Sequence, residues 1–210
     1  MFYPLFLDLE NRAVLVVGGG VVAERKVESL LGAGAAVILV APNVNASLAA
    51  LANSNTIQLR LRKFIESDLD GMVLVISATG DPAAQEQIAV AARSRNIPIN
   101  TVDQPGLCDF IVPAMIRKGD IVVAISTSGR SPALAATLRA KLESVITVDA
   151  ARAARVLGEV RNEVHLQFPD PDRRKYVFES IVASGILDWI KECDDAAALE
   201  RVRGIIEKLA

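Results

Sequence analysis

The chain has 210 residues and a formal net charge of -2, and 51% of its residues are hydrophobic while only 4% are aromatic. A charge this close to neutral argues against nucleic acid as the main partner, because phosphate contacts require a clear excess of Lys and Arg. Many aliphatic and few aromatic side chains favour a buried parallel sheet covered by helices.

The N-terminus and the cysteines indicate the compartment. The opening MFYPLFLDLENR has neither a basic leader nor a small-residue cleavage site, and no apolar run is long enough to cross a bilayer. Cys108 and Cys193 lie far apart and form no C-x-x-C pair. We therefore expect a soluble cytoplasmic protein with no membrane contact and no disulfide framework.

Strand and helix patterns alternate through the first half of the chain. Such βαβ alternation predicts an α/β fold, a Rossmann-like doubly wound parallel sheet with right-handed crossovers. The expected strands are 13–17, 36–40, 56–61, 72–77 and 97–102, and the expected helices are 22–31, 45–53 and 82–95.

The pattern changes after residue 109. Residues 110–116 and 121–126 are interpreted as two strands joined by the polar turn RKGD, followed by a helix at 132–143. From residue 148 onward only helical periodicity remains, broken at FPDPD. We predict an NAD-binding Rossmann domain at 1–112, a small α+β middle segment at 113–147 and a C-terminal helical domain at 148–210.

The first motif is a glycine-rich turn between a strand and a helix. Gly18-Gly19-Gly20-Val21-Val22-Ala23 fits G-x-G-x-x-A. Gly18 permits the tight turn, Gly20 lets the backbone approach a pyrophosphate, and Ala23 lets helix and strand pack closely. The start of the helix then offers N–H groups to the phosphates. The motif predicts dinucleotide binding.

The loop after the second strand lacks the acid that usually binds the adenosine ribose. Ala41-Pro42-Asn43 stands there, so backbone groups or Asn43 must hold the hydroxyls. No Lys or Arg lies between Lys26 and Arg60 to hold a 2′-phosphate, which favours NAD over NADP.

Asp103 follows the last strand of the predicted sheet, at the edge where open α/β sheets bind ligands. Its carboxylate is a candidate general base, with capping of the turn as the equal alternative. Asp109 is interpreted as a solvated acid at the edge of a strand.

The loop AISTSGRSP precedes a helix that begins with Pro132. Its hydroxyls and amides, together with the Arg130 charge, predict an anion site, and capping of the helix by Ser131 is compatible with it. The loop is similar to the phosphosugar loop of sugar isomerase domains. The loop residues assigned to a substrate site are Ser126, Thr127, Ser128, Gly129 and Arg130.

Three stretches in order, YPLFLDLENRAVLVVGGGVVAERKVESLLGAGAAVILVAP, TVDQPGLCDFIVPAMI and AISTSGRSPALAATLR, resemble the precorrin-2 dehydrogenase / sirohydrochlorin ferrochelatase family. The resemblance covers about residues 1–145. That family also lacks the usual ribose acid. The resemblance implies an enzyme that oxidises precorrin-2 to sirohydrochlorin with NAD in siroheme biosynthesis.

The resemblance also implies roles for individual residues. Asp103 corresponds to the catalytic aspartate, and Val21, Val22, Pro42 and Asn43 correspond to NAD contacts. It implies a homodimer with the middle segment at the interface. Some members then insert Fe²⁺, and this activity stays open here, with iron as a substrate and no metal site built from the chain. Arg117 joins the candidate contacts for the carboxylates of the tetrapyrrole.

Two alternative functions, from other classes of protein, remain. A regulatory Rossmann module that senses NAD(H) needs neither Asp103 nor the serine loop. A phosphosugar-binding isomerase-type domain explains STSGRS but leaves the glycine loop without a role. Only the dehydrogenase uses all three motifs.

Overall fold

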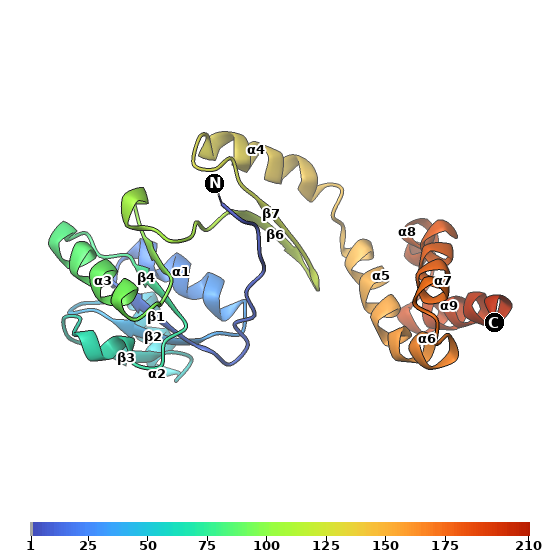
Figure 1. Cartoon of the computed structure of the whole chain (residues 1–210), viewed down its shortest axis with the longest axis horizontal. Helices are drawn as coiled ribbons and strands as arrows, with labels where there is room; N and C mark the ends of the chain where they lie inside the picture. Colours follow the sequence, from blue (N-terminus) through green and yellow to red (C-terminus); the bar gives the residue numbers. More distant parts are fainter. Residues whose placement is uncertain (1) are drawn as a thin grey trace. The chain divides into compact units, whose positions relative to one another are not determined.

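The computed structural model describes residues 2–210 and contains two compact units, with the boundary between Val112 and Pro113 (Figure 1). The separate C-terminal domain predicted from residue 148 stays a prediction.

The first unit holds a five-stranded sheet in the order β3-β2-β1-β4-β5, in which every neighbouring pair is parallel. This confirms the predicted doubly wound α/β fold. The strands β3, β4 and β5 begin two residues later than predicted. The elements are β1 (Ala13–Val17), α1 (Val21–Leu31), β2 (Ala36–Val40), α2 (Ala46–Asn53), β3 (Gln58–Arg60), η1 (Glu66–Leu69), β4 (Leu74–Ser77), α3 (Pro82–Ser94), β5 (Ile99–Thr101) and η2 (Pro105–Leu107).

Alternate residues of β1 face two different cores because side chains alternate along a strand. Val14 and Val16 are buried on the face covered by α1 and α2, and Leu15 and Val17 on the face covered by α3 and η1. Full burial of such a side chain stabilises the fold by roughly 1.5–3 kcal/mol. The helical partners are Ala23, Val27, Leu30 and Leu48 on the first face and Leu69, Ile88, Ala89 and Ala92 on the second.

Local capping sets where the helices begin. Asn45 accepts a hydrogen bond of 3.0 Å from the Leu48 amide at the start of α2. Asp81 accepts one of 3.0 Å from the Ala83 amide, with Pro82 as the first residue of α3. Each cap satisfies an amide that has no partner in its own helix and contributes about 1 kcal/mol.

The second unit opens with an antiparallel hairpin of β6 (Ala114–Lys118) and β7 (Ile121–Ile125), followed by α4 (Pro132–Glu143). The hairpin confirms the predicted change of pattern, but the predicted strand at 110–116 is wrong in its position. Phe110 packs against the core of the first unit, and its carbonyl accepts a 2.9 Å hydrogen bond from Asn100. The turn is shorter than RKGD, because Gly119, with a φ of 55°, allows the chain to reverse directly after Lys118.

The remaining residues form only helices, as predicted. Ala153, Val156, Val177, Ile181 and Val202 are among the residues of their common core. No helix within residues 2–210 has the length and apolar character needed to cross a membrane. The elements are α5 (Val148–Glu159), α6 (Arg161–Gln167), α7 (Pro171–Ala183), α8 (Ile186–Trp189), η3 (Ile190–Glu192) and α9 (Asp195–Leu209).

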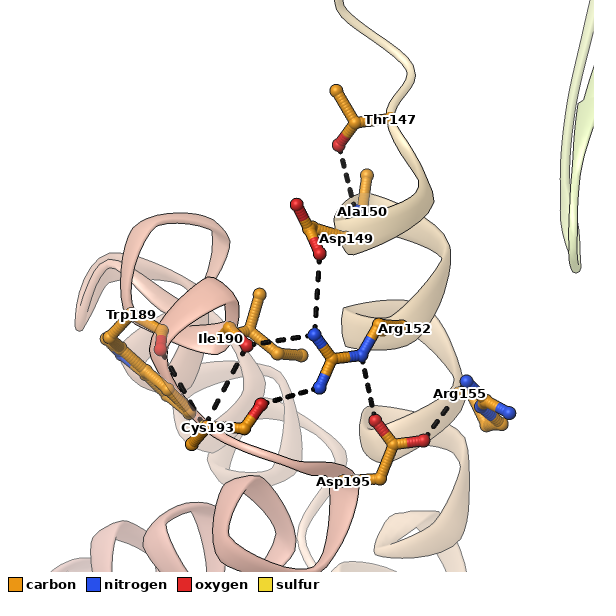
Figure 2. A network of polar contacts seen from close by, with 9 residues as sticks. All are labelled: Thr147, Asp149, Ala150, Arg152, Arg155, Trp189, Ile190, Cys193 and Asp195. Atoms are coloured by element: carbon orange, nitrogen blue, oxygen red, sulfur yellow. Dashed lines mark hydrogen bonds and ion pairs between the residues drawn. The ribbon is translucent and has the colours of Figure 1, made fainter.

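A polar network centred on Arg152 joins these helices (Figure 2). Its guanidinium donates to the carboxylates of Asp195 at 2.9 Å and Asp149 at 3.4 Å. It also donates to the carbonyl oxygens of Cys193 at 2.7 Å and Ile190 at 3.1 Å. One side chain of α5 thus holds the chain segment that connects η3 to α9.

Candidate active site

The first unit has a cavity of about 390 Å³ where the order of the strands reverses. The chain runs outward from β1 to β2 and β3 on one side, and β4 and β5 lie on the other side of β1. Ligands of open α/β sheets bind at this point, outside the carboxyl ends of the strands. The lining residues are 20–22 after β1, 78–80 after β4, 102–104 after β5, and Pro82 and Gln85 of α3.

The three glycines of the first loop lack a side chain for different structural reasons. Gly18 has a φ of 131°, and a Cβ there would collide with the carbonyl oxygen of Ala78. A Cβ at Gly19 would collide with the carbonyl oxygen of Asn43. A Cβ at Gly20 would meet no atom of the chain within 4 Å and would enter open space. Packing therefore requires Gly18 and Gly19, whereas Gly20 leaves room for a ligand to approach the backbone, as a pyrophosphate requires.

The start of α1 has backbone amides without a partner in the helix. Gly20 is the N-cap, and no side chain caps the helix there. The first amides of α1 are therefore available to an anion, and the helix dipole favours negative charge at this end. Glu24 lies in the first turn, but its carboxylate accepts a hydrogen bond of 2.5 Å from Asn45. The residues present fit a dinucleotide pyrophosphate.

The loop after β2 lies against the glycine loop. Ala41 is buried, whereas Pro42 and Asn43 are exposed. The amide of Asn45 donates a 3.0 Å hydrogen bond to the carbonyl of Gly19. Contacts of Pro42 and Asn43 with the adenosine half of a nucleotide stay a prediction.

Asp103 lies on the cavity, next to the glycine loop. Its φ of 61° places it in the left-handed region, which non-glycine residues seldom adopt. Within residues 2–210 no hydrogen bond or ion pair engages its exposed carboxylate. By contrast, the exposed Asp109 accepts hydrogen bonds from Arg93 at 2.9 Å and from the Ile99 amide at 3.2 Å, so its carboxylate is already engaged. Of these two acids, Asp103 is the one whose carboxylate is available to a ligand.

Gln85 is a cavity residue that the sequence analysis missed. It is only 6% exposed, and its Nε2 donates to the carbonyl oxygens of Thr79 at 2.7 Å and Val102 at 3.3 Å. It therefore ties the loop after β4 to the loop that carries Asp103. A signal was available, because Gln85 shares the buried face of α3 with Ile88 and Ala89, where a polar side chain requires hydrogen-bond partners.

The serine loop belongs to the second unit. Thr127 Oγ1 donates to the carbonyl of Ser131 and accepts from its amide, both at 3.0 Å. Ser126 accepts from the Ser128 amide at 3.0 Å. Ser131 caps α4 through the Leu134 amide at 3.2 Å, as predicted. Three of the hydroxyls therefore shape the loop itself.

Two arginines predicted for this substrate site are exposed. Arg130 lies in the serine loop and Arg117 in β6, and neither forms an ion pair with any residue that the structure describes. The structure thus brings Gly20, Val21, Val22 and Asp103 to one cavity, whereas the predicted substrate residues lie on the other unit. Residues 2–210 hold no group of three His, Cys, Asp or Glu side chains placed to bind a metal ion.

A glycine-rich strand–helix turn beside a cavity at the reversal point of a parallel sheet defines a dinucleotide-binding α/β protein. A family model described as "Putative NAD(P)-binding" matches residues 5–114, and a model described as "Sirohaem biosynthesis protein central" matches residues 118–144. The chain belongs to this NAD(P)-binding family and carries the central segment of the sirohaem biosynthesis proteins directly after it. These matches confirm the predicted family and the predicted NAD-type cofactor.

Individual relatives agree with this assignment. The chain is 42% identical over 178 residues to siroheme synthase of Methylococcus capsulatus, covering 85% of this chain and 38% of the relative. It is 38% identical over 198 residues to siroheme synthase of Nitrosomonas eutropha, covering 94% and 42%. The chain thus spans about two fifths of the length of these relatives. The solved structure of SirC, precorrin-2 dehydrogenase, matches with a TM-score of 0.76 at 26% identity, over 99% of this chain and 98% of that one.

Proposed function

We propose that this protein oxidises precorrin-2 to sirohydrochlorin with NAD⁺ as the hydride acceptor. The observation that carries the proposal is the cavity in which the glycine loop and Asp103 meet. The similarity to a structure named precorrin-2 dehydrogenase, over nearly the full length of both chains, supports this substrate. A module that only senses NAD(H) leaves the unengaged carboxylate without a role.

The reaction removes two electrons and two protons from the macrocycle. When bound, the nicotinamide accepts a hydride, which carries both electrons and one proton. The second proton leaves as the conjugation extends, and Asp103 is the residue that takes it from the substrate. A base whose carboxylate is held by no other side chain is free to accept this proton.

The residues proposed to bind the cofactor belong to the first unit, and those proposed to bind the substrate belong to the second. Residues 18–23 hold the pyrophosphate through backbone amides, and Pro42 and Asn43 contact the adenosine half. In the second unit, hydrogen bonds and positive charge suit a substrate that carries several carboxylates. The residues proposed to hold these carboxylates are Ser126, Thr127, Ser128, Gly129, Arg130 and Arg117.

We propose that the protein acts as a cytoplasmic homodimer through the segment 113–147. An apolar row on α4 supports this interface, because Leu134, Leu138 and Leu142 recur every four residues and are exposed in the single chain. Exposed apolar rows of this kind mark protein–protein contacts. Sedimentation of the wild type beside Leu138→Glu tests this: the substitution converts a dimer to a monomer.

Insertion of Fe²⁺ into sirohydrochlorin is a second step that the same site is proposed to permit. Iron here is a substrate, and the tetrapyrrole nitrogens would bind it. The role that Asp103 would have is to accept the protons that leave those nitrogens.

The experiment is NADH formation from precorrin-2 and NAD⁺ without oxygen, with the wild type beside Asp103→Asn. A matched control is Asp70→Asn, because Asp70 is an exposed acid outside the cavity. We expect turnover in the wild type and in the control, and its loss in Asp103→Asn with NAD⁺ binding retained. A folded wild type that binds NAD⁺ but forms no NADH contradicts the proposal. Adding Fe²⁺ to the product then shows whether siroheme forms.

A further inference from the structure

A buried carboxylate holds two arginines at one end of the sheet. The Asp68 side chain is 0% exposed. It accepts hydrogen bonds from Arg60 at 2.6 Å and from both terminal nitrogens of Arg62 at 2.6 and 2.7 Å. The Ile65 amide donates a further hydrogen bond of 3.0 Å. Every oxygen of this carboxylate is therefore engaged.

Arg60 and Arg62 lie near the end of β2, the strand whose following loop is expected to face the adenosine ribose. Arg60 is the last residue of β3 and pairs with Val40, the last residue of β2. The Ala41 amide donates to the Arg60 carbonyl at 3.3 Å. Because the carboxyl ends of parallel strands meet at one edge, Arg60 and Arg62 neighbour the loop that faces the ribose in a dinucleotide site.

Arginine at this place usually determines which dinucleotide binds. A guanidinium presents two parallel N–H groups to a phosphate, and an arginine near the end of the second strand accommodates the 2′-phosphate of NADP. The absence of Lys and Arg from the loop itself is therefore not sufficient to explain a preference for NAD, because Arg60 at the end of β3 and Arg62 just after it lie next to that loop.

The geometry of the cluster occupies the fork of Arg62, whereas Arg60 donates to Asp68 through one nitrogen only. Both terminal nitrogens of Arg62 are directed at Asp68, and one of them also donates to the Lys63 carbonyl at 3.1 Å. The side chains of Arg60 and Arg62 are 29% and 41% exposed, so both remain accessible to solvent. Pairing with the Asp68 carboxylate, and not burial, therefore keeps Arg62 from binding a phosphate.

We propose that Asp68 is a specificity-determining residue, which withholds Arg62 from the 2′-phosphate of NADP⁺ and so selects NAD⁺. The inference rests on the dinucleotide site of the proposed function. Specificity of this kind is a difference between two affinities, and it changes when the group that opposes one ligand is removed.

The test is calorimetric titration of the full chain with NAD⁺ and with NADP⁺, which differ only in the 2′-phosphate. Asp68→Asn keeps an oxygen for the Ile65 amide and removes the charge that holds the arginines. We expect it to bind NADP⁺ on the order of tenfold more tightly than the wild type, with NAD⁺ binding changed less than twofold. Asp70→Asn, which removes a nearby surface acid paired with Arg95, is expected to leave both affinities unchanged.

A double variant assigns the gain to Arg62. Adding Arg62→Gln to Asp68→Asn is expected to return NADP⁺ binding toward the wild-type value. A folded Asp68→Asn with no gain for NADP⁺ overturns the proposal, and so does a gain that survives in the double variant. If Asp68→Asn does not fold, Arg62→Gln alone decides, because a side chain that Asp68 already withholds contributes nothing to NADP⁺ binding: an unchanged NADP⁺ affinity supports the proposal, and a weaker one overturns it.

The titration also separates this inference from the proposed function. A gain in NADP⁺ binding by Asp68→Asn, in a protein that oxidises no precorrin-2, leaves the role of Asp68 supported while the proposed reaction fails. A wild type that binds neither nucleotide overturns both.

Discussion

Gln85 of α3 donates a hydrogen bond of 3.3 Å to the carbonyl of Val102, the residue directly before Asp103. The same nitrogen donates to Thr79 at 2.7 Å. The helix after β4 therefore anchors the backbone directly before the candidate base, Asp103, whose φ is 61°.

Replacing Gln85 by Leu tests this role. We expect the NAD⁺ affinity to fall and kcat to fall by about tenfold or more, since small displacements of a catalytic group are costly. Loss of the donor also leaves two carbonyls without a partner and lowers the free energy of unfolding by about 1–3 kcal/mol. Steady-state kinetics and urea unfolding measure the two effects. Gln87→Leu, on the exposed face of the same helix, is the matched control. Equal kcat values for the two variants would contradict the role.

Two neighbouring glycines are expected to respond differently to the same substitution. Gly20→Ala places a Cβ in open space, so the free energy of unfolding should change by less than about 1 kcal/mol. The same methyl obstructs a pyrophosphate, so NAD⁺ should bind on the order of tenfold more weakly. Gly19→Ala instead forces a Cβ against the Asn43 carbonyl and should destabilise the fold. Thermal unfolding and calorimetry separate the cases. Unchanged NAD⁺ affinity in a folded Gly20→Ala would remove the phosphate role from this loop.

The lowered pKa of Asp68 predicts how the free energy of unfolding depends on pH in the acid range. Burial alone raises the pKa of its carboxyl, but hydrogen bonds from Arg62, the Ile65 amide and Arg60, with the attraction of Arg62, outweigh it and lower the pKa from 3.8 to about 2. Because the folded-state pKa is depressed, the stabilisation is complete above the unfolded pKa and is lost as the pH falls from about 4 to 2. It amounts to about 2 kcal/mol.

Urea unfolding at several pH values measures this loss. The wild type should lose about 2 kcal/mol more than Asp68→Asn between pH 4 and 2, because the variant has no carboxylate to protonate. Asp70→Asn should retain the full wild-type slope. Parallel curves for the wild type and Asp68→Asn would show that the carboxylate contributes nothing to acid stability.

The Arg152 network predicts a local source of stability in the helical part of the second unit (Figure 2). Arg152→Met removes donors to two carboxylates and two carbonyls and should lower the free energy of unfolding by roughly 2–3 kcal/mol. Arg155→Met removes only an exposed pair with Asp195, at 3.1 Å, and should cost less than about 1 kcal/mol. Denaturant unfolding of the full chain compares them. An equal cost for both variants would mean that the carbonyl contacts of Arg152 add nothing.

The sequence by itself determined the features that depend on a few neighbouring residues. Runs of Val, Leu and Ile predicted the strands, and Ser131 predicted the start of α4, because a cap bonds an amide two or three residues away. The glycine loop followed from a strand, three glycines and a helix in direct succession. The family could be assigned from these motifs and their order.

The tertiary structure decided what depends on residues far apart in the chain. Phe110 left the predicted strand because its partners, Asn100 and the core of the first unit, are tertiary. Gln85 reached Val102, and Arg60 came to lie beside the end of β2, only because the sheet has the order β3-β2-β1-β4-β5. The spacing of residues along the chain does not specify which strands become neighbours. The strand order is set when helices cover both faces of the sheet at once. Arg60 and Arg62 therefore lie outside the loop after β2 in the sequence, and only the folded chain places them next to that loop, paired with Asp68.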